Sequence, residues 1–200
     1  MMSFNYKNKI IALCGFKGCG KDFVAKYLRE TYNFEHLKIS TKLKEISKIL
    51  FDIDDDQIEG NKKECIDERW NVTPRQIMQF VGTEMFQYKI QELIPECDRN
   101  FWIKSFVNDV KSNKNKNKNK NIVVSDMRFL HEYNYLIKHL RTHEMIVIRI
   151  DSSTKNIYDT KDTHVSETEY RQIPIDFQIT NNMTDDIKSS LDTIINLIKY

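Results

Sequence analysis

The residues best suited to chemistry form a glycine-rich segment near the start of the sequence, Gly15-Phe16-Lys17-Gly18-Cys19-Gly20-Lys21-Asp22. This segment fits the phosphate-binding pattern G-x-x-x-x-G-K-[ST] except at its last position, where Asp22 replaces Ser or Thr. Gly15 would end a strand, and Gly18 and Gly20 would let backbone N–H groups turn toward phosphate oxygens. Lys21 would add a positive charge near the β- and γ-phosphates, and the helix N-terminus would supply further donors.

The departure at Asp22 matters because the missing hydroxyl normally binds Mg²⁺ directly. A carboxylate is also a hard oxygen ligand, so Asp22 could hold the ion directly or through a water. The alternative interpretation is a glycine turn followed by a surface lysine. A strand expected before the segment and a helix expected after it favour the phosphate-binding interpretation.

A second group of chemical residues, Ser125-Asp126-Met127-Arg128, ends the clearest predicted strand, Ile122–Ser125. Ligands of parallel sheets bind at the carboxyl ends of the strands. Asp126 there can hold the water shell of Mg²⁺, and Arg128 can neutralise phosphoryl oxygens. The alternative is that Asp126 merely caps the next helix.

Polar residues also accompany the helix predicted from Pro74, namely Arg75, Gln79 and an expected turn at 82–84. Arg75 would lie in the first helical turn, where the helix dipole disfavours a cation. An anionic ligand would account for it, and so would a surface salt bridge with Glu68 or Asp67.

Two further parts of the sequence have more than one possible interpretation. Trp70 could stack on a base or pack at the edge of the domain. Asp162-Thr163-His164 and Glu167 lie in an aperiodic stretch where a lid could be inserted, although His164 taken alone is typical of a surface residue.

Periodicity predicts the elements that would position these residues. Short apolar runs predict strands at residues 9–14, 36–40, 122–125, 145–150 and 177–180. Apolar residues at helical spacing predict helices at 21–32, from Thr41 (as cap) to 51, from Pro74 (with Thr73 and Gln76 as a capping box), at 102–110, at 130–140 and at 191–198. Alternating strands and helices predict an α/β fold, a parallel sheet with helices on both faces.

The length and composition of the chain exclude some classes of function. The chain has 200 residues, a mass of 23.9 kDa and a net charge of +2, which suits one domain. The low-complexity run NKNKNKNKN at 113–121 predicts a solvated loop without aromatics for base stacking. Without its four lysines the net charge falls from +2 to −2, so no basic nucleic-acid surface remains.

The expected cellular compartment follows from membrane, export and cysteine signals that the sequence lacks. No apolar run approaches the roughly 20 residues that a membrane helix needs, and the first residues lack a signal peptide's apolar region. The four cysteines lack paired C-x-x-C spacing, which predicts free thiols in a reducing compartment and no zinc site. A cytoplasmic protein, in the host cytoplasm if viral, is expected.

Together these motifs resemble the deoxynucleoside monophosphate kinases of tailed bacteriophages and large DNA viruses. The resemblance follows the chain in order, and an Asp after the loop lysine is a feature of this family. It is carried by Gly20-Lys21-Asp22, Ser40 with Leu43-Lys44, Trp70 with Arg75 to Thr83, Phe101-Trp102, Asp126-x-Arg128, Asp162-Thr163-His164-x-x-Glu167 and Ile179-Thr180-Asn181. Phosphomevalonate kinases of animals share the Gly-Lys-Asp-Phe-Val and Ser-Asp-x-Arg stretches and are the alternative family.

The resemblance implies an adenylate-kinase-like fold and Mg-ATP-dependent phosphorylation of a deoxynucleoside 5′-monophosphate. It implies that Gly15 to Asp22 hold the ATP phosphates, that Asn181 lies near the ATP base, and that Asp22 and Asp126 hold the metal. Lys21, Asp126 and Arg128 would be catalytic. The acceptor would contact Ser40, Lys44, Trp70, Arg75, Gln79, Arg128, Thr163, His164 and Glu167. Relatives also suggest a homodimer.

The resemblance also divides the single kinase domain into regions. The acceptor would bind at about 36–100 and a lid would span about 151–172. The surface loop expected at 112–121 follows from composition instead, because the run of Asn and Lys is peculiar to this chain. Where relatives tend to carry arginine at the lid entrance, this chain has Ile150-Asp151-Ser152, so lid charge would come from Lys155, Lys161 or Arg171.

Other function classes fit less well. A regulatory GTPase should show N-K-x-D after a strand, which Asn61-Lys62-Lys63-Glu64 does not provide. A non-catalytic nucleotide sensor is expected to have lost Lys21, Asp126 or Arg128, and all three are present.

Overall fold

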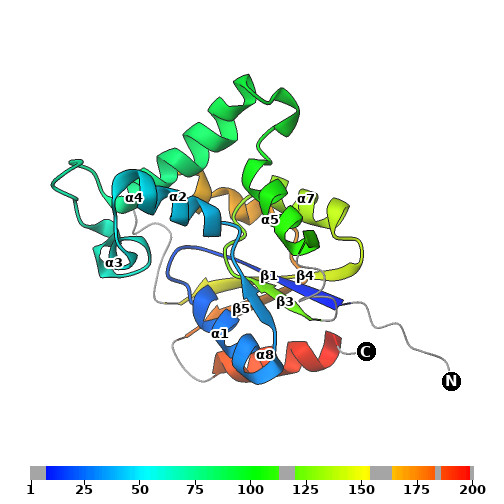
Figure 1. Cartoon of the computed structure of the whole chain (residues 1–200). Helices are drawn as coiled ribbons and strands as arrows, with labels where there is room; N and C mark the ends of the chain where they lie inside the picture. Colours follow the sequence, from blue (N-terminus) through cyan, green and yellow to red (C-terminus); the bar gives the residue numbers. More distant parts are fainter. Residues whose placement is uncertain (1–7, 113–119, 154–163, 183–185, 199–200) are drawn as a thin grey trace. The chain divides into compact units, whose positions relative to one another are not determined.

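The structure, a computed structural model, describes residues 8–112, 120–153, 164–182 and 186–198 (Figure 1). The chain divides into two compact units. Unit 1 comprises Met1–Lys38 and Asp109–Tyr200, and unit 2 comprises Ile39–Asn108. Most of the predicted surface loop, 113–119, and the middle of the predicted lid, 154–163, lie outside the described residues.

Unit 1 is built on a parallel sheet with the strand order β2-β3-β1-β4-β5. The strands are β1 Asn8–Cys14, β2 Glu35–Leu37, β3 Ile122–Val124, β4 His143–Ser152 and β5 Phe177–Asn181. β1 is central, and its residues from Ile10 to Cys14 are almost entirely buried, as expected for a strand covered on both faces. The sheet confirms the predicted α/β class.

Helices cover both faces of this sheet (Figure 1). α1 (Lys21–Tyr32) and α8 (Asp186–Ile198) pack against one face, where Leu28 and Leu191 join Ile11 and Ile148 in the main apolar core. α7 (Leu130–His139) lies on the opposite face and buries Leu136. Each helix therefore directs an apolar stripe at the sheet, as its sequence period predicts.

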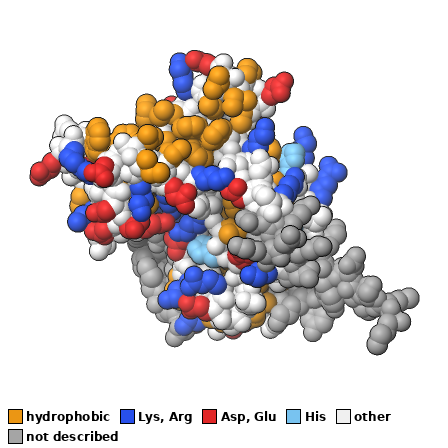
Figure 2. Space-filling view, in the orientation of Figure 1, with side chains coloured by type: hydrophobic (Ala, Val, Ile, Leu, Met, Phe, Trp, Pro, Cys, Tyr) orange, Lys and Arg blue, Asp and Glu red, His pale blue; other side chains and the backbone are white. Residues whose placement is uncertain are grey.

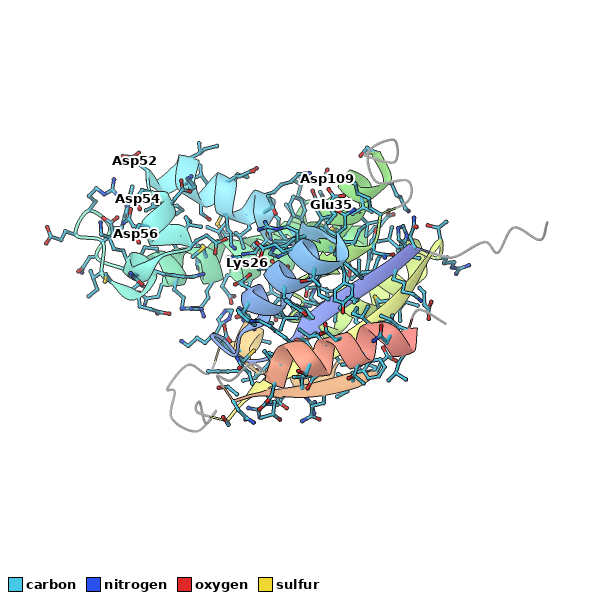
Figure 3. All side chains as sticks on the ribbon, turned by 90° about the horizontal axis from the view of Figure 1, so that it is seen from below. Lys26, Glu35, Asp52, Asp54, Asp56 and Asp109 are labelled. Atoms are coloured by element: carbon cyan, nitrogen blue, oxygen red, sulfur yellow. The ribbon has the colours of Figure 1, made fainter. Side chains whose placement is uncertain are left out.

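Unit 2 is helical. It contains α2 Thr41–Phe51, α3 Asp55–Ile58, η1 Asn61–Glu64, α4 Pro74–Gln79, η2 Phe80–Tyr88, η3 Lys89–Glu92, η4 Pro95–Cys97 and the start of α5, Phe101–Ser112. Ile53, Ile58 and Met78 form a small core. Three acidic side chains, Asp52, Asp54 and Asp56, lie around α3 (Figure 3).

Several predicted details of unit 2 are borne out and others are wrong. The capping box of Thr73 and Gln76 is present at the start of α4. Thr41, however, is the first residue of α2 rather than its cap, because the helix extends one residue further toward Ser40. The polar stretch after α2 is not featureless, since Asp54 and Gln57 form a second capping box that starts α3.

The turn expected at 82–84 is also wrong, because these residues lie inside η2, a continuous π-helix. Gly82 permits a close approach here, since a Cβ on it would lie 2.8 Å from Leu43 Cδ2. Its carbonyl accepts a hydrogen bond from Trp102 Nε1 at 2.9 Å. Packing against α2 and α5 thus keeps the glycine helical where its local propensity favours a turn.

The strand predicted at 36–40 is shorter than expected. β2 ends at Leu37 because it is the edge strand and pairs only with β3, residue for residue from Glu35 opposite Ile122 to Leu37 opposite Val124. In the described ranges, no helix has both the length and the apolar character needed to cross a membrane.

Candidate active site

The glycine-rich segment forms a tight loop between β1 and α1. Gly15, Gly18 and Gly20 all have positive φ angles, at 143°, 71° and 107°, a backbone region that disfavours residues with a Cβ. A Cβ on Gly15 would lie 2.2 Å from the carbonyl oxygen of Ile150. The glycines therefore allow the loop to fold against the end of β4.

Lys21 lies at the start of α1 with its ammonium inside this loop. Nζ donates to the carbonyl oxygens of Gly15 and Phe16, each at 2.8 Å, and only 8% of the residue is exposed. Burial lowers the pKa of Lys21, because an ammonium loses hydration in the loop. The loop thus holds a cation whose charge an anion could compensate.

Asn181, the last residue of β5, supports the loop from the side. Its Nδ2 donates to the carbonyl of Cys19 at 3.0 Å, and only 6% of the residue is exposed. A Cβ on Gly20 would lie 2.5 Å from the same nitrogen. The nearby thiols are free, and burial raises the pKa of Cys14 to about 12, so that thiol stays protonated.

Asp126 and Arg128 follow β3, next to the loop. Ala12 of β1 lies opposite Val124 of β3 in parallel register, so both strands deliver the residues after them to the same edge of the sheet. Asp126 does not cap α7, which begins at Leu130 with Phe129 in the cap position. The alternative interpretation of Asp126 as a mere helix cap is therefore wrong.

Glu132 fixes the backbone of this turn. Its Oε2 accepts the backbone N–H of Arg128 at 2.7 Å and that of Phe129 at 3.0 Å. Only 5% of Glu132 is exposed. Burial, with a smaller contribution from the negative charge of Asp126, raises its pKa from 4.5 to about 8.

Glu167 joins the arginine to the loop. Its Oε1 lies 2.6 Å from Arg128 Nη1, and its Oε2 accepts the backbone N–H of Lys17 at 3.1 Å. The Glu167 side chain is 1% exposed, whereas that of Arg128 is 26% exposed. A buried carboxylate thus fixes the guanidinium while leaving part of it accessible.

Asp22 is the exposed member of a chain of polar contacts that joins the start of α1 to the ends of β2 and β3. Its Oδ1 lies 3.1 Å from Lys38 Nζ and accepts the hydroxyl of Ser125 at 3.2 Å. Ser125 Oγ in turn lies 2.7 Å from His36 Nε2. The Asp that departs from the phosphate-loop pattern is therefore held by residues that follow β2 and β3.

The candidate acceptor residues of unit 2 lie on two helices that pack together, α2 and α4. Ser40 is the N-cap of α2, and its carbonyl accepts the backbone N–H of Lys44 one turn later at 3.0 Å. Arg75 and Gln79 are four residues apart on α4, so they share a helix face. Lys44 pairs with Glu59, and Arg75 pairs with Glu64 rather than with Glu68 or Asp67. Gln79 Nε2 is buried and has no hydrogen-bond partner in the structure as described.

Trp70 projects from a short, well-fixed turn of unit 2. The residue is 45% exposed, its Nε1 donates to the Phe51 carbonyl at 2.8 Å, and its ring meets Phe51 edge-on. Asp67 anchors the turn by accepting hydrogen bonds from Arg69 and Gln57, and these bonds hold the pKa of the Asp67 carboxyl well below its usual range. Trp70 therefore packs against Phe51 while nearly half of the residue stays exposed.

The expected lid residues are described only in part. Thr163 lies outside the described residues. His164 starts a short 3₁₀ helix, where its Nδ1 accepts the backbone N–H of Ser166 at 3.2 Å. The Glu169 carboxylate accepts the backbone N–H of Leu130, the first residue of α7, at 3.2 Å. Together with the contact between Glu167 and Arg128, it holds this segment against the turn that leads into α7.

Sequence reasoning did not assign roles to Glu132, Lys38, His36 or the Ser125 hydroxyl. Nothing in the local pattern separates Glu132 from a surface residue of an amphipathic helix, because only the fold buries it. Ser125 belongs to the Ser-Asp-x-Arg motif, and its place directly before Asp126 is the signal that the sequence offers for it.

These features define a class. A parallel sheet in which a glycine-rich loop joins the central strand to the first helix, with Asp and Arg at the end of the neighbouring strand, is the arrangement of a phosphate-loop kinase.

Comparison with known proteins gives the family. The family model for deoxynucleotide monophosphate kinases matches residues 49–191. A protein of Acanthamoeba polyphaga mimivirus named "Putative deoxynucleotide monophosphate kinase" is 34% identical over 179 residues, covering 88% of this chain and 89% of that one. The chain belongs to the deoxynucleotide monophosphate kinase family and is a phosphotransferase, which confirms the family expected from its motifs.

Solved structures resemble the chain more distantly. A "putative kinase" from Chloroflexus aurantiacus has a TM-score of 0.49 at 12% identity, covering 96% of this chain and 94% of that one. Shikimate kinase from Aquifex aeolicus has a TM-score of 0.42 at 14% identity, with 94% and 98% covered. At these values, the similarities carry no conclusion about the substrate.

The raised pKa of Glu132 makes stability depend on pH. Folding retains a proton that the unfolded chain releases above 4.5, so the contribution of Glu132 to stability is full below that pH and is lost as the pH rises through about 8. Glu132→Gln keeps an acceptor oxygen without the charge. It should therefore become more stable than wild type across this window, by on the order of a few kcal/mol at its upper end.

Urea unfolding at a series of pH values measures this difference. Glu30→Gln, which removes an exposed carboxylate on α1, is the matched control and should follow wild type. Parallel stability profiles for wild type and Glu132→Gln would show that Glu132 ionises normally in the folded protein.

Proposed function

We propose that the protein transfers the γ-phosphoryl group of Mg-ATP to deoxynucleoside 5′-monophosphates, which yields diphosphates for DNA synthesis. The observation that carries the proposal is the loop ammonium of Lys21 next to the Asp126–Arg128 turn, in a chain of the deoxynucleotide monophosphate kinase family. The loop from Gly15 to Asp22 would hold the ATP phosphates through backbone N–H groups, and Lys21 would neutralise their charge. Asn181 would support the loop at the nucleotide end.

Magnesium fits the residues at this edge of the sheet. Mg²⁺ in kinase sites is usually held by one or two carboxylates together with substrate phosphates and waters. Asp22 and Asp126 offer two such carboxylates, and Asp22 Oδ1 already has the ammonium of Lys38 as a cationic partner. When bound, the ion would neutralise negative charge on the nucleotide phosphates.

We propose that unit 2 binds the acceptor, as the expected acceptor region at about 36–100 implies. The cations Lys44 and Arg75 pair with carboxylates that are about half exposed, and such pairs exchange partners at little cost. An acceptor phosphate could therefore replace either carboxylate. The side-chain amide nitrogen of Gln79 is buried and has no described partner, so it could donate a hydrogen bond to an oxygen or nitrogen of the base. Ser40 and Trp70 would complete the acceptor site.

The reaction needs positioning more than proton transfer. A phosphate monoester is already a nucleophile at neutral pH, so a strong general base is unnecessary, and catalysis rests on orientation and charge neutralisation. Arg128 would contact the acceptor phosphate and the transferring group, with its guanidinium held by Glu167. Thr163, His164 and Glu167 would belong to a lid over the site.

Mg-ATP-dependent release of ADP tests the proposal, with dTMP, dGMP, dCMP, dAMP, their ribose forms and phosphomevalonate as separate acceptors. We expect turnover with one or more deoxynucleotides. Turnover with phosphomevalonate alone would favour the alternative family, and ATP binding without any turnover would indicate a nucleotide sensor.

Two substitutions test the roles of the cations. Lys21→Ala should lose most activity, because the loop loses its buried charge. Arg128→Ala should lose at least about 100-fold in kcat while it still binds ATP, since it would act on the transferring group. Lys26→Ala and Arg141→Ala, which remove exposed cations, are the controls. Near-normal turnover in either test variant would contradict these assignments.

We also propose that two copies associate through unit 2. Apolar side chains gather on the surface of this unit (Figure 2), and exposed apolar surface of this kind marks interaction sites. Its exposed members include Ile49, Leu50, Phe80, Met85 and Leu93.

Free thiols at all four cysteines support the proposed cytoplasmic location, because that compartment is reducing.

Light scattering on an eluting size-exclusion peak measures the association. Wild type should elute with the mass of a dimer, and Met85→Glu should shift it toward the monomer because a charge would be buried between copies. Leu197→Glu places the same charge at an exposed leucine of α8 in unit 1 and should leave the dimer intact. A monomeric wild type would refute the proposal.

A further inference from the structure

The ion pair between Asp22 and Lys38 compensates for the position at which this phosphate loop departs from the common pattern. Ser or Thr at that position is neutral, whereas Asp22 adds a negative charge at the first turn of α1, beside the place where nucleotide phosphates would bind. An uncompensated carboxylate there would repel those phosphates. Lys38 Nζ, 3.1 Å from Asp22 Oδ1, offsets this charge.

Lys38 is well placed for this task. It follows directly on the last residue of β2, Leu37, and its side chain is 22% exposed. β3 lies between β2 and β1 in the sheet, so the lysine side chain reaches past the end of β3 to meet the start of α1. A flexible lysine can make this span and can also swing away, because its ammonium is a point charge on a long stem.

Two further residues fix the oxygen that Lys38 contacts. The Ser125 hydroxyl donates to Asp22 Oδ1 at 3.2 Å and is 2.7 Å from His36 Nε2. Since the hydroxyl proton points at Asp22, the contact with His36 requires an Nε2–H donor. Ser125 is 2% exposed, so this donor is anchored in the fold, whereas the Lys38 ammonium reaches Asp22 on a long side chain that is 22% exposed.

We propose that Lys38 is the resident counter-cation of Asp22, and that the divalent ion of the nucleotide displaces it. This inference rests on the proposed function, in which Asp22 is a metal ligand. Before the ion arrives, Lys38 cancels the repulsion between Asp22 and the incoming phosphates. When the ion arrives, the ammonium and the ion compete for one carboxylate, because two cations on the same oxygen repel each other.

Removing Lys38 should therefore change two affinities in opposite directions. In Lys38→Met, ADP should bind about three- to fivefold more weakly in the presence of a chelator, because Asp22 then lacks the positive charge of Lys38. With saturating ADP, Mn²⁺ should bind about three- to fivefold more tightly, because its competitor is gone. This range matches what an ion pair with one exposed partner contributes.

Calorimetry with ADP in the presence of EDTA measures the first affinity, and electron paramagnetic resonance of free Mn²⁺ at saturating ADP measures the second. The matched control is Lys26→Met, which removes an exposed lysine one turn further along α1 (Figure 3). The same comparison in an Asp22→Asn background forms a double-mutant cycle, in which both effects of Lys38→Met should disappear. Lys38→Arg, which keeps the charge, should stay close to wild type.

The inference predicts weaker ADP binding together with tighter Mn²⁺ binding in Lys38→Met, and this combination makes it falsifiable. It is overturned if Lys38→Met changes both affinities no more than Lys26→Met does, or if its effects persist with Asn at position 22. A large loss of turnover in Lys38→Met with unchanged Mn²⁺ affinity would also overturn it and place Lys38 on the substrate. Failure of the proposed function is distinguishable, because it would appear in wild type, as binding of ADP without turnover of any acceptor.

Discussion

The parallel pairing of β1 with β3 and β4 is the constraint on which the rest of the site depends. Ile10 to Ala12 lie opposite Ile122 to Val124, and the whole of β1 is matched to residues 143–149 of β4. This register brings the loop after β1 to the same edge as the Asp126–Arg128 turn, and it places the Ile150 carbonyl against Gly15. A slip of one residue would turn every strand side chain to the other face.

Buried charge at this edge is compensated by the chain itself. The Lys21 ammonium is held by two loop carbonyls, and Glu167 is held by Arg128 and a loop N–H. Glu132, which its raised pKa of about 8 keeps largely protonated at neutral pH, accepts two backbone N–H groups. An uncompensated charge at such depth would cost several kcal/mol. These contacts orient the groups before a ligand binds, which is the arrangement that phosphoryl transfer rewards most.

Much of this could be predicted from the sequence. The strand-loop-helix around Lys21, the strand before Asp126 and the capping box at Thr73 each have a local signal that the structure bears out. The turn expected at Gly82 was wrong because packing against Leu43 and Trp102 overrides local propensity. Glu132 and Lys38 were missed because their importance arises from contacts between elements, and a single sequence carries no record of such contacts.

The two units differ in how firmly they hold their polar side chains. In unit 1, Lys21, Glu132 and Glu167 are each less than a tenth exposed, so their geometry is rigid. In unit 2, the side chains of Lys44 and Arg75 are each 17% exposed and pair with carboxylates that are about half exposed, so water or another anion can replace the carboxylates at little cost. Rigid geometry suits the transfer of the phosphoryl group, whereas exchangeable pairs would allow an acceptor phosphate to replace a carboxylate when it binds. Selectivity among bases would then depend on buried groups such as Gln79, because a polar group that a wrong base leaves unpaired costs far more than an exposed ion pair.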